Sequence, residues 1–292
     1  MSDSMTPLSP NSIAIEQETS SENPVGEFFQ ETGALTKRLF IQLKRRPSTL
    51  VAGIIQPLMW LILFGALFQY APEGLLGEGL SYGKFLAPGV IVFTAFSGAL
   101  NAGLPVMFDR EFGFLNRLLV APLSSRYSIV AASTIYIISL SLLQTASIVA
   151  LSAVIGAGLP SLAGLGAIAL IVFLIVAGVT ALSLGLAFAL PGHIELIAVI
   201  FVTNLPLLFA STALAPLNFM ADWLKVVASV NPLTYAIEPI RYIYLNGEWS
   251  LTSTVLETSW FNFSFGATIL ALVAFDLVIL FLIQPLLRRR FA

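Results

Sequence analysis

Long apolar segments constrain the fold of this chain more than any other feature of its sequence. A helix needs roughly 20 mostly apolar residues to cross the hydrocarbon core of a bilayer, which is about 30 Å thick. Charged residues make up only 10% of the 292 residues. Soluble domains carry about 25%, so a larger soluble core cannot account for the apolar excess. The sequence therefore predicts an all-α integral membrane protein with six transmembrane helices, at about residues 48–70, 85–107, 127–156, 163–190, 194–214 and 265–287.

Most of the 14 Lys and Arg residues fall on one side of these six spans. They lie before span one (Lys37, Arg38, Lys44, Arg45 and Arg46), between spans two and three (Arg110, Arg117 and Arg126) and after span six (Arg288, Arg289 and Arg290). Because cytoplasmic loops carry an excess of Lys and Arg, we expect both termini to be cytoplasmic. On the opposite side, we expect the tryptophans before the last span to anchor the chain at the outer interface, namely Trp223, Trp249 and Trp260.

Residues 1–25 differ from the rest of the chain. They are rich in Ser, Pro, Asn and Glu and contain no apolar stretch of the kind that a signal peptide needs. This composition is typical of disordered segments. We therefore predict a disordered cytoplasmic tail followed by one membrane domain, residues 26–292.

Residues 27–46 have the pattern of an amphipathic helix. Apolar residues share one arc of the helix, and the basic residues Lys37, Arg38, Lys44 and Arg45 share the other, with Arg46 directly before Pro47. Such a basic helix is typical of the cytoplasmic membrane interface. The alternative is an ordinary solvated linker helix.

A second amphipathic pattern covers Asp109 to Pro122, between spans two and three. At the helical period, one narrow arc holds the polar and small residues, namely Asp109, Arg110, Gly113, Asn116 and Arg117. Glu111 points into the opposite, apolar arc, so we expect it to have a specific partner. Pro122 ends the helix. The pattern predicts a short cytoplasmic helix whose polar ridge contacts something in the cytosol; the alternative is a plain turn between two spans.

The composition excludes several chemistries. The chain has no Cys and a single His, His193, so thiolate or multi-histidine metal sites and Cys nucleophiles are absent from the sequence. We expect His193 to be no more than an interfacial polar residue. The Gly83–Lys84 pair lacks the other residues of a phosphate-binding loop, and no G-x-S-x-G motif occurs. A net charge of −2 gives no indication of nucleic-acid binding.

Two segments resemble the signatures of ABC-2 type transporter permeases, the six-span membrane subunits of ATP-driven exporters. "REFGFLNRLLVAPLSS" is similar to the cytoplasmic loop of that family, and the matching residues are Arg110, Glu111, Gly113, Pro122 and Ser124. "NPLTYAIEPIRYIYLNG" is similar to the segment before the last span, and the matching residues are Asn231, Pro232 and Arg241. Phe114 departs from the pattern, because many relatives have Thr there. The likeness covers about residues 27–290 and is greatest to the drug-, polysaccharide- and lipid-exporting branch, with its cyanobacterial and plastid members.

The resemblance implies partners and a division of labour. The chain would bind no cofactor itself, and ATP and Mg would be used by two separate cytosolic ABC ATPase subunits. A second permease copy, or a similar chain, would complete the assembly in the plasma membrane or a thylakoid membrane. Residues 109–122 would be a coupling helix seated on the ATPase, with Arg110 and Arg117 docking, and residues 27–46 a connecting helix. Residues 216–247 would supply short re-entrant helices.

Further details of the site rest on single residues. We expect Glu111 to bond to the connecting helix, at Lys37, Arg38 or Lys44. Asp276 lies in the middle of span six with no Lys or Arg inside a span to pair with it, so it marks either a functional site or a structural polar contact. Asn204 has the same two interpretations. The other amides within spans are Gln56, Asn101 and Gln144, which we expect to join helices.

Two rival functions remain open from the sequence. A secondary transporter driven by an ion gradient usually has carboxylates in several spans or inverted repeats, and this chain has one Asp and no evident repeat. A membrane-embedded enzyme would need catalytic residues that the sequence lacks. The apolar spans favour an amphipathic or lipid-linked cargo, but do not distinguish a drug, a lipid or a polysaccharide on a lipid carrier.

Overall fold

The computed structural model of the chain describes residues 24–45, 47–68, 82–113, 127–154, 158–258 and 260–291. The predicted tail therefore lies almost entirely outside the described residues. The helices are α1 (Pro24–Arg45), α2 (Pro47–Leu67), α3 (Tyr82–Leu100), α4 (Gly103–Glu111), α6 (Tyr127–Val154), α7 (Leu162–Ala189), α8 (His193–Phe209), η2 (Leu217–Phe219), α9 (Asp222–Val230), α10 (Pro232–Asn246) and α11 (Phe265–Phe291). Two strands, β1 (Thr254–Glu257) and β2 (Asn262–Ser264), precede α11.

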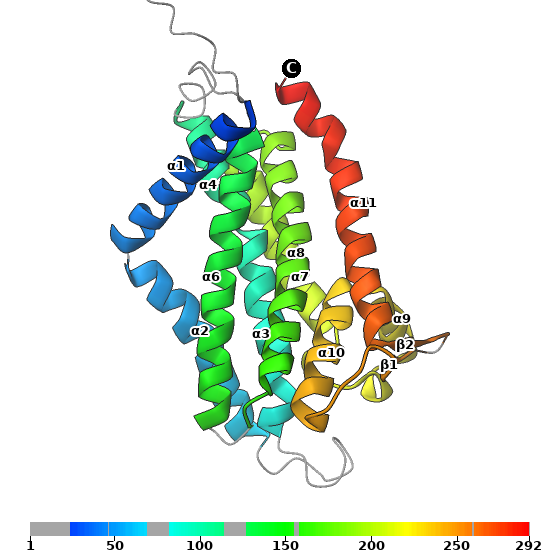
Figure 1. Cartoon of the computed structure of the whole chain (residues 1–292). Helices are drawn as coiled ribbons and strands as arrows, with labels where there is room; N and C mark the ends of the chain where they lie inside the picture. Colours follow the sequence, from blue (N-terminus) through cyan, green and yellow to red (C-terminus); the bar gives the residue numbers. More distant parts are fainter. Residues whose placement is uncertain are drawn as a thin grey trace, which may run out of the picture.

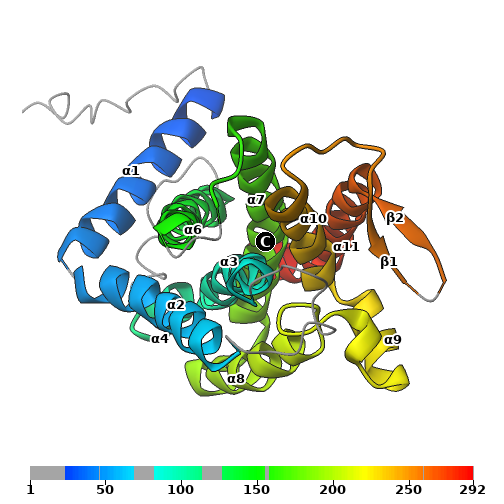
Figure 2. The same cartoon turned by 90° about the horizontal axis from the view of Figure 1, so that it is seen from below.

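The helices form an elongated bundle with α3 and α7 at its centre (Figures 1 and 2). Both central helices are apolar throughout most of their length, and each buries a majority of its residues. Around them lie α6, α10, α11, α8 and α2, while α1 packs obliquely along α6. We call the end that carries α4 and the C-terminus of α11 the α1 end, and the opposite end, with α9, α10 and the strands, the hairpin end (Figure 1).

Four helical stretches within the described ranges are long and apolar enough to cross a membrane: Tyr82–Glu111, Tyr127–Val154, Leu162–Ala189 and Phe265–Pro285. They correspond to predicted spans two, three, four and six. The helices at predicted spans one and five are shorter apolar helices, Val51–Leu67 and His193–Phe209. The structure is therefore that of a helical membrane protein, and the count of six spans stays a prediction.

The predicted second span is interrupted in the structure. α3 ends at Leu100 and α4 begins at Gly103. The Ser183 hydroxyl of α7 fills the break, since it donates to the Leu100 carbonyl (2.6 Å) and accepts from the Gly103 amide (2.9 Å). A buried hydroxyl thereby satisfies backbone groups that a continuous helix would have paired.

The predicted helix over Asp109 to Pro122 also requires correction at its start. Residues Asp109–Glu111 are the last turn of α4, and Gly113 follows with a φ of 77°. A left-handed glycine at this place ends a helix, because other residues adopt that conformation at a cost. Residues 114–126, with Asn116, Arg117 and Pro122, lie outside the described part of the chain.

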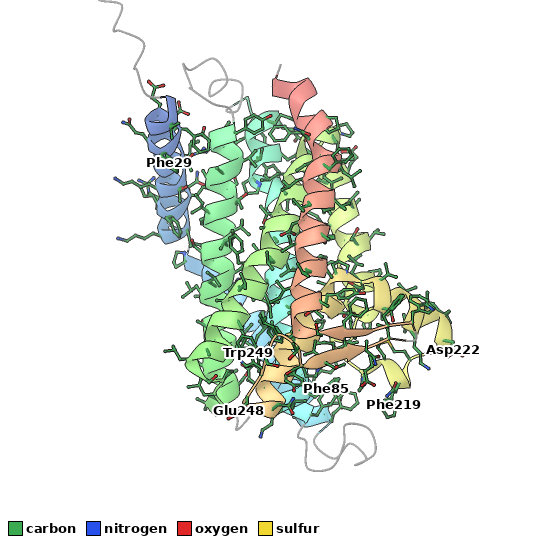
Figure 3. All side chains as sticks on the ribbon, turned by 45° about the vertical axis from the view of Figure 1, so that its right-hand side comes forward. Phe29, Phe85, Phe219, Asp222, Glu248 and Trp249 are labelled. Carbon is green, nitrogen blue, oxygen red and sulfur yellow. The ribbon has the colours of Figure 1, made fainter. Side chains whose placement is uncertain are left out.

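The segment before α11 is not wholly helical. The short helices α9 and α10 agree with the prediction that prolines divide this segment, but β1 and β2 form an antiparallel hairpin, with Thr254 opposite Ser264 and Glu257 opposite Asn262. The strands are too short for an alternating pattern to reveal them. Figure 3 places Phe85 and Trp249 inside the hairpin end, and Phe219 and Asp222 at its edge.

The three tryptophans before α11 are not equivalent. Trp249 stacks on Phe265 with ring centroids 4.6 Å apart. Trp223 and Trp260 are exposed on α9 and the hairpin. Trp249 is therefore a packing residue, and only the other two have the exposure that the predicted interfacial anchors require.

Candidate functional site

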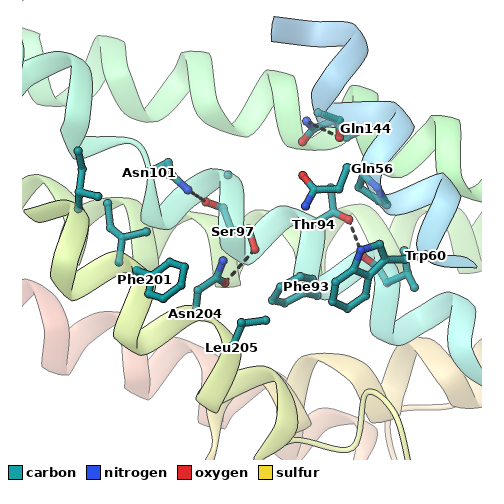
Figure 4. Close-up of a pocket in the computed structure, with 16 residues that line it drawn as sticks. Gln56, Trp60, Phe93, Thr94, Ser97, Asn101, Gln144, Phe201, Asn204 and Leu205 are labelled. Atoms are coloured by element: carbon teal, nitrogen blue, oxygen red, sulfur yellow. Dashed lines mark hydrogen bonds between the residues drawn. The ribbon is translucent and has the colours of Figure 1, made fainter. Parts of the chain in front are cut away.

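A pocket of about 600 Å³ opens between α2, α3, α6 and α8 (Figure 4). Its wall is mainly apolar, and Trp60 of α2 stacks on Phe93 of α3 with ring centroids 5.7 Å apart. None of the residues that line it carries a charge. A cavity of this size, lined by aromatic and aliphatic groups with a few polar ones, has the character of a small-molecule site.

The polar groups of the pocket come from four helices, α2, α3, α6 and α8, and from the break after α3. The Ser97 hydroxyl of α3 donates to the side-chain oxygen Oδ1 of Asn204 on α8 (3.0 Å). The side-chain amide of Asn101 donates to the backbone carbonyl of Ser97 (2.7 Å). Gln144 of α6 donates to the Gly53 carbonyl of α2 (3.2 Å), while its own carbonyl oxygen is buried without a hydrogen-bond partner among the described residues. Amides predicted to join helices thus lie together on one cavity (Figure 4).

The last turn of α4 contacts three other helices through consecutive charged residues. Asp109 forms an ion pair with Arg38 of α1 (3.2 Å). The Arg110 guanidinium donates to carbonyls at the end of α7, at 2.8 Å from Ala187, 2.6 Å from Leu190 and 2.7 Å from Pro191. Cationic groups at a helix C-terminus are favoured by the helix dipole. The predicted docking of Arg110 to an ATPase stays a prediction; in this structure its guanidinium joins α4 to α7.

Glu111 contacts the start of α8. Its carboxylate accepts from the His193 backbone amide (2.6 Å) and lies 2.5 Å from the His193 ring nitrogen Nδ1. The carboxylate therefore faces the positive end of the α8 dipole.

These contacts correct two predictions. Glu111 does have a specific partner, but the prediction that it bonds to Lys37, Arg38 or Lys44 is wrong. Glu111 bonds to His193, and Arg38 pairs with Asp109. Two residues along a helix turn the side chain by about 200°, so Asp109 and Glu111 point to different neighbours. His193 is not merely an interfacial residue, since it binds Glu111.

Exposure separates Arg38 from the other basic residues of the predicted interfacial helix. Lys37, Lys44 and Arg45 are exposed on α1, and Arg46 lies outside the described residues. α1 itself begins three residues before the predicted start. Its apolar arc faces α6, where Phe40 packs edge-on against Tyr136 with centroids 5.3 Å apart.

The second signature segment surrounds the other end of α8. Asn231 caps α10 by accepting from the Leu233 amide (2.9 Å), and its amide donates to the carbonyls of Leu207 (2.8 Å) and Ala210 (2.5 Å). Pro232 follows as the first residue of α10, where its missing N–H leaves no gap. One asparagine side chain therefore joins the end of α8 to the start of α10.

Arg241 lies in the same region and is only 5% exposed. It donates to the carbonyls of Thr212 (2.5 Å) and Phe85 (3.3 Å), pairs with Glu238, and stacks over the Phe85 ring at 3.8 Å. These bonds hold α10 against the start of α3 and the turn after α8.

Asp276 stands apart from both regions. It lies on α11 and faces Gly178 of α7, where an added Cβ would collide with its carboxylate. Its Oδ1 atom is buried with no hydrogen-bond partner among the described residues. Among all the residues that the structure describes, no group of three or more His, Cys, Asp or Glu side chains could hold a metal ion.

Comparison with known proteins assigns this architecture. The model of the ABC-2 type transporter family matches residues 30–245, which contain the first signature segment and all but the last two residues of the second. The chain belongs to the ABC-2 type transporter family. It is 52% identical over 277 residues to the "Putative transport permease ycf38" of Cyanophora paradoxa, covering 95% of this chain and 96% of that protein. It is 54% identical over 264 residues to the protein of the same name from Porphyra purpurea, covering 90% and 91%.

A more distant relative is the "Probable doxorubicin resistance ABC transporter permease protein DrrC" of Mycobacterium tuberculosis. It is 25% identical over 232 residues, covering 78% of this chain and 81% of that protein. The ABC-2 family membership confirms the resemblance read from the two signature segments. The chain is a membrane permease of the transporter class.

Proposed function

We propose that this ABC-2 permease is the membrane subunit of an ATP-driven exporter that moves an amphipathic or lipid-linked cargo out of the cytoplasm. Two cytosolic ABC ATPase subunits bind ATP and Mg, and a second permease copy completes the membrane part. The chain itself binds no nucleotide. In this arrangement the α1 end faces the cytosol, both termini are cytosolic, and the protein lies in the plasma membrane or a thylakoid membrane.

The observation that carries the proposal is the uncharged pocket between α2, α3, α6 and α8. Its stacked Trp60 and Phe93 suit the apolar body of a cargo, and the amides of Asn101, Gln144 and Asn204 suit a few polar groups. An ion would find no charged ligand among the lining residues. The family and the doxorubicin-resistance name of the more distant relative support the same class of cargo.

The mechanism follows from a two-state packing of the helices. ATP binding brings the two ATPases together, and the segment that starts at Asp109 and continues through Asn116 and Arg117 moves with them. The bundle then changes between inward-open and outward-open arrangements, a shift whose bias is supplied by nucleotide. Because α8 forms one wall of the pocket, a small displacement of this helix alters the width of the cavity.

Filling the pocket tests the cargo site. Leu205→Trp places an indole at the lining of the pocket, while Leu170→Trp places one on the exposed face of α7. With doxorubicin as the probe in proteoliposomes that contain the permease and its ATPase, we expect Leu205→Trp to lower ATP-dependent transport about tenfold and Leu170→Trp to leave it near wild type. If the loss is one of cargo binding, a tenfold change corresponds to ~1.4 kcal/mol.

ATP hydrolysis serves as the internal control for assembly. Both variants are expected to hydrolyse ATP within about twofold of wild type, because neither residue lies near the α1 end. Equal doxorubicin transport by the two variants would show that the pocket is not the cargo site.

A further inference from the structure

Few residues of α8 are buried within one copy of the chain. Only three of its seventeen residues are buried, Leu196, Ile200 and Leu208. Several of its large apolar side chains are exposed, among them Phe201 at 72% and Val202 at 69%. Because packing within one copy covers so little of α8, the polar groups that bind its two termini account for much of its attachment to the rest of the chain.

At the N-terminus of α8, the binding group comes from another helix. The residue before the helix, Gly192, offers no side-chain cap. The Glu111 carboxylate of α4 accepts from the first amide of α8 instead, at 2.6 Å. An ordinary N-cap Ser, Thr or Asp accepts from the second or third amide of its helix. Here a residue 82 positions earlier in the chain accepts from the first.

At the C-terminus of α8, the binding group again comes from elsewhere in the chain. Asn231 donates to the Leu207 and Ala210 carbonyls, which are among the last of the helix and its following turn. Arg241 donates to Thr212 in the same turn. The two signature segments, which are far apart in the sequence, thus bind opposite ends of one helix.

The pocket lies between these two ends. Ile197, Phe201, Asn204 and Leu205 of α8 line it, and Asn204 accepts a hydrogen bond from Ser97 on the facing helix α3. α4 is separated from α3 by the break at Asn101 and Ala102, and its last turn is bonded to the start of α8.

We infer that α8 is the element that transmits motion from the Asp109–Gly113 turn to the pocket, with Glu111 as the positioning residue at its driven end and Asn231 as the one at its fixed end. This inference rests on the proposed function, since it assumes that nucleotide moves the segment after α4. It assigns to Glu111 a role inside the permease, through α8, and not a contact with the ATPase.

The experiment measures the position of α8 directly. The chain has no Cys, so spin labels can be placed at Val202 of α8 and Leu143 of α6, both exposed. Labelled chains are diluted with unlabelled chains, so that each distance is measured within one copy. The distance distribution is recorded in the full complex with the ATPase, with and without Mg-ATP, for wild type, Glu111→Ala and Glu111→Gln.

The matched control is Glu195→Ala. Glu195 is an exposed carboxylate in the first turn of the same helix, so its removal changes the charge at that end without breaking the bond to α4. We expect the nucleotide-dependent shift of wild type to persist in Glu195→Ala, to fall by at least half in Glu111→Gln, and to disappear in Glu111→Ala. ATP hydrolysis by Glu195→Ala should stay within about twofold of wild type. Glu111→Gln keeps the size of the side chain and one acceptor oxygen, so it provides the test if Glu111→Ala does not assemble.

The outcomes separate the two claims. A wild-type complex that hydrolyses ATP with no change in the distance between α6 and α8 overturns the transmission role. A wild-type chain that binds no ATPase, and transports without one, overturns the proposed function itself. A full wild-type shift in Glu111→Gln or Glu111→Ala contradicts the inference and leaves the proposed function standing.

Discussion

Arg241 illustrates how much one signature residue can hold. Its guanidinium bonds to two backbone carbonyls and one carboxylate while stacking on Phe85. A planar group with five donors can satisfy these partners at once, and a Lys cannot. The matching residue of the family segment is thus explained by the backbone groups it pairs, without any contact to cargo.

Removing Arg241 should destabilise the fold much more than removing an exposed cation. Arg241→Met leaves the carboxylate of Glu238 and two carbonyls without their partner, a loss of about 3–5 kcal/mol, which lowers the melting temperature by about 10 °C for a chain of this size. Lys225→Met breaks a pair of the same spacing whose Asp222 is 99% exposed, which costs about 0–1 kcal/mol. Thermal unfolding in detergent, followed by circular dichroism, compares the two. Equal melting temperatures would contradict the structural role given to Arg241.

At the scale of elements, the break between α3 and α4 depends on the absence of a side chain. A Cβ on Gly103 would collide with the carbonyl of Ser183, whereas a Cβ on Gly166 of α7 would meet nothing within 4 Å. Gly103 is needed because α4 and α7 approach each other closely there. At Gly166 no close neighbour requires a glycine, and the conformational freedom of glycine lowers the stability of α7.

Alanine at these two glycines should therefore have opposite effects. We expect Gly103→Ala to lower the free energy of unfolding by about 1–3 kcal/mol through overpacking. Gly166→Ala should raise it by up to about 1 kcal/mol, because Ala favours a helix interior over Gly. Chemical unfolding in mixed micelles measures both. Stabilisation by Gly103→Ala would mean that α4 does not lie against Ser183 as described.

The elements also show which features the sequence could predict. The amphipathic division of α1 locates that helix to within a few residues, since the pattern is local. The charged turn at Asp109 can be predicted from the sequence for the same reason, since its amphipathic pattern is also local. The partner of Glu111 was not predictable, because His193 is distant in the sequence and helix rotation, not composition, decides which neighbour a side chain meets. The pocket cannot be predicted from the sequence, because its lining comes from four helices that are separate in the chain.

The whole molecule combines two polar regions with one uncharged cavity. The Asp109–Glu111 turn binds α1, α7 and α8 at the α1 end, and Asn231 and Arg241 bind α8, α10 and α3 at the hairpin end. Between them, the pocket has only neutral polar groups. This arrangement suits a permease whose energy arrives from outside the membrane, because the charged contacts lie at the two ends and the residues that line the pocket between them carry no charge.

An ion-gradient mechanism would place the energy source inside the membrane instead. Asp276 on α11 is the carboxylate that such a mechanism would use, and it lies away from the pocket against Gly178. In the proposed mechanism Asp276 plays no part in the coupling, and transport should not depend on a proton gradient.

The most direct measurement is doxorubicin transport in sealed proteoliposomes that contain the permease with or without its cytosolic ABC ATPase. We expect transport only with the ATPase and Mg-ATP together, at a rate that a protonophore leaves unchanged. Transport on an imposed proton gradient, with no ATPase and no nucleotide present, would contradict the account.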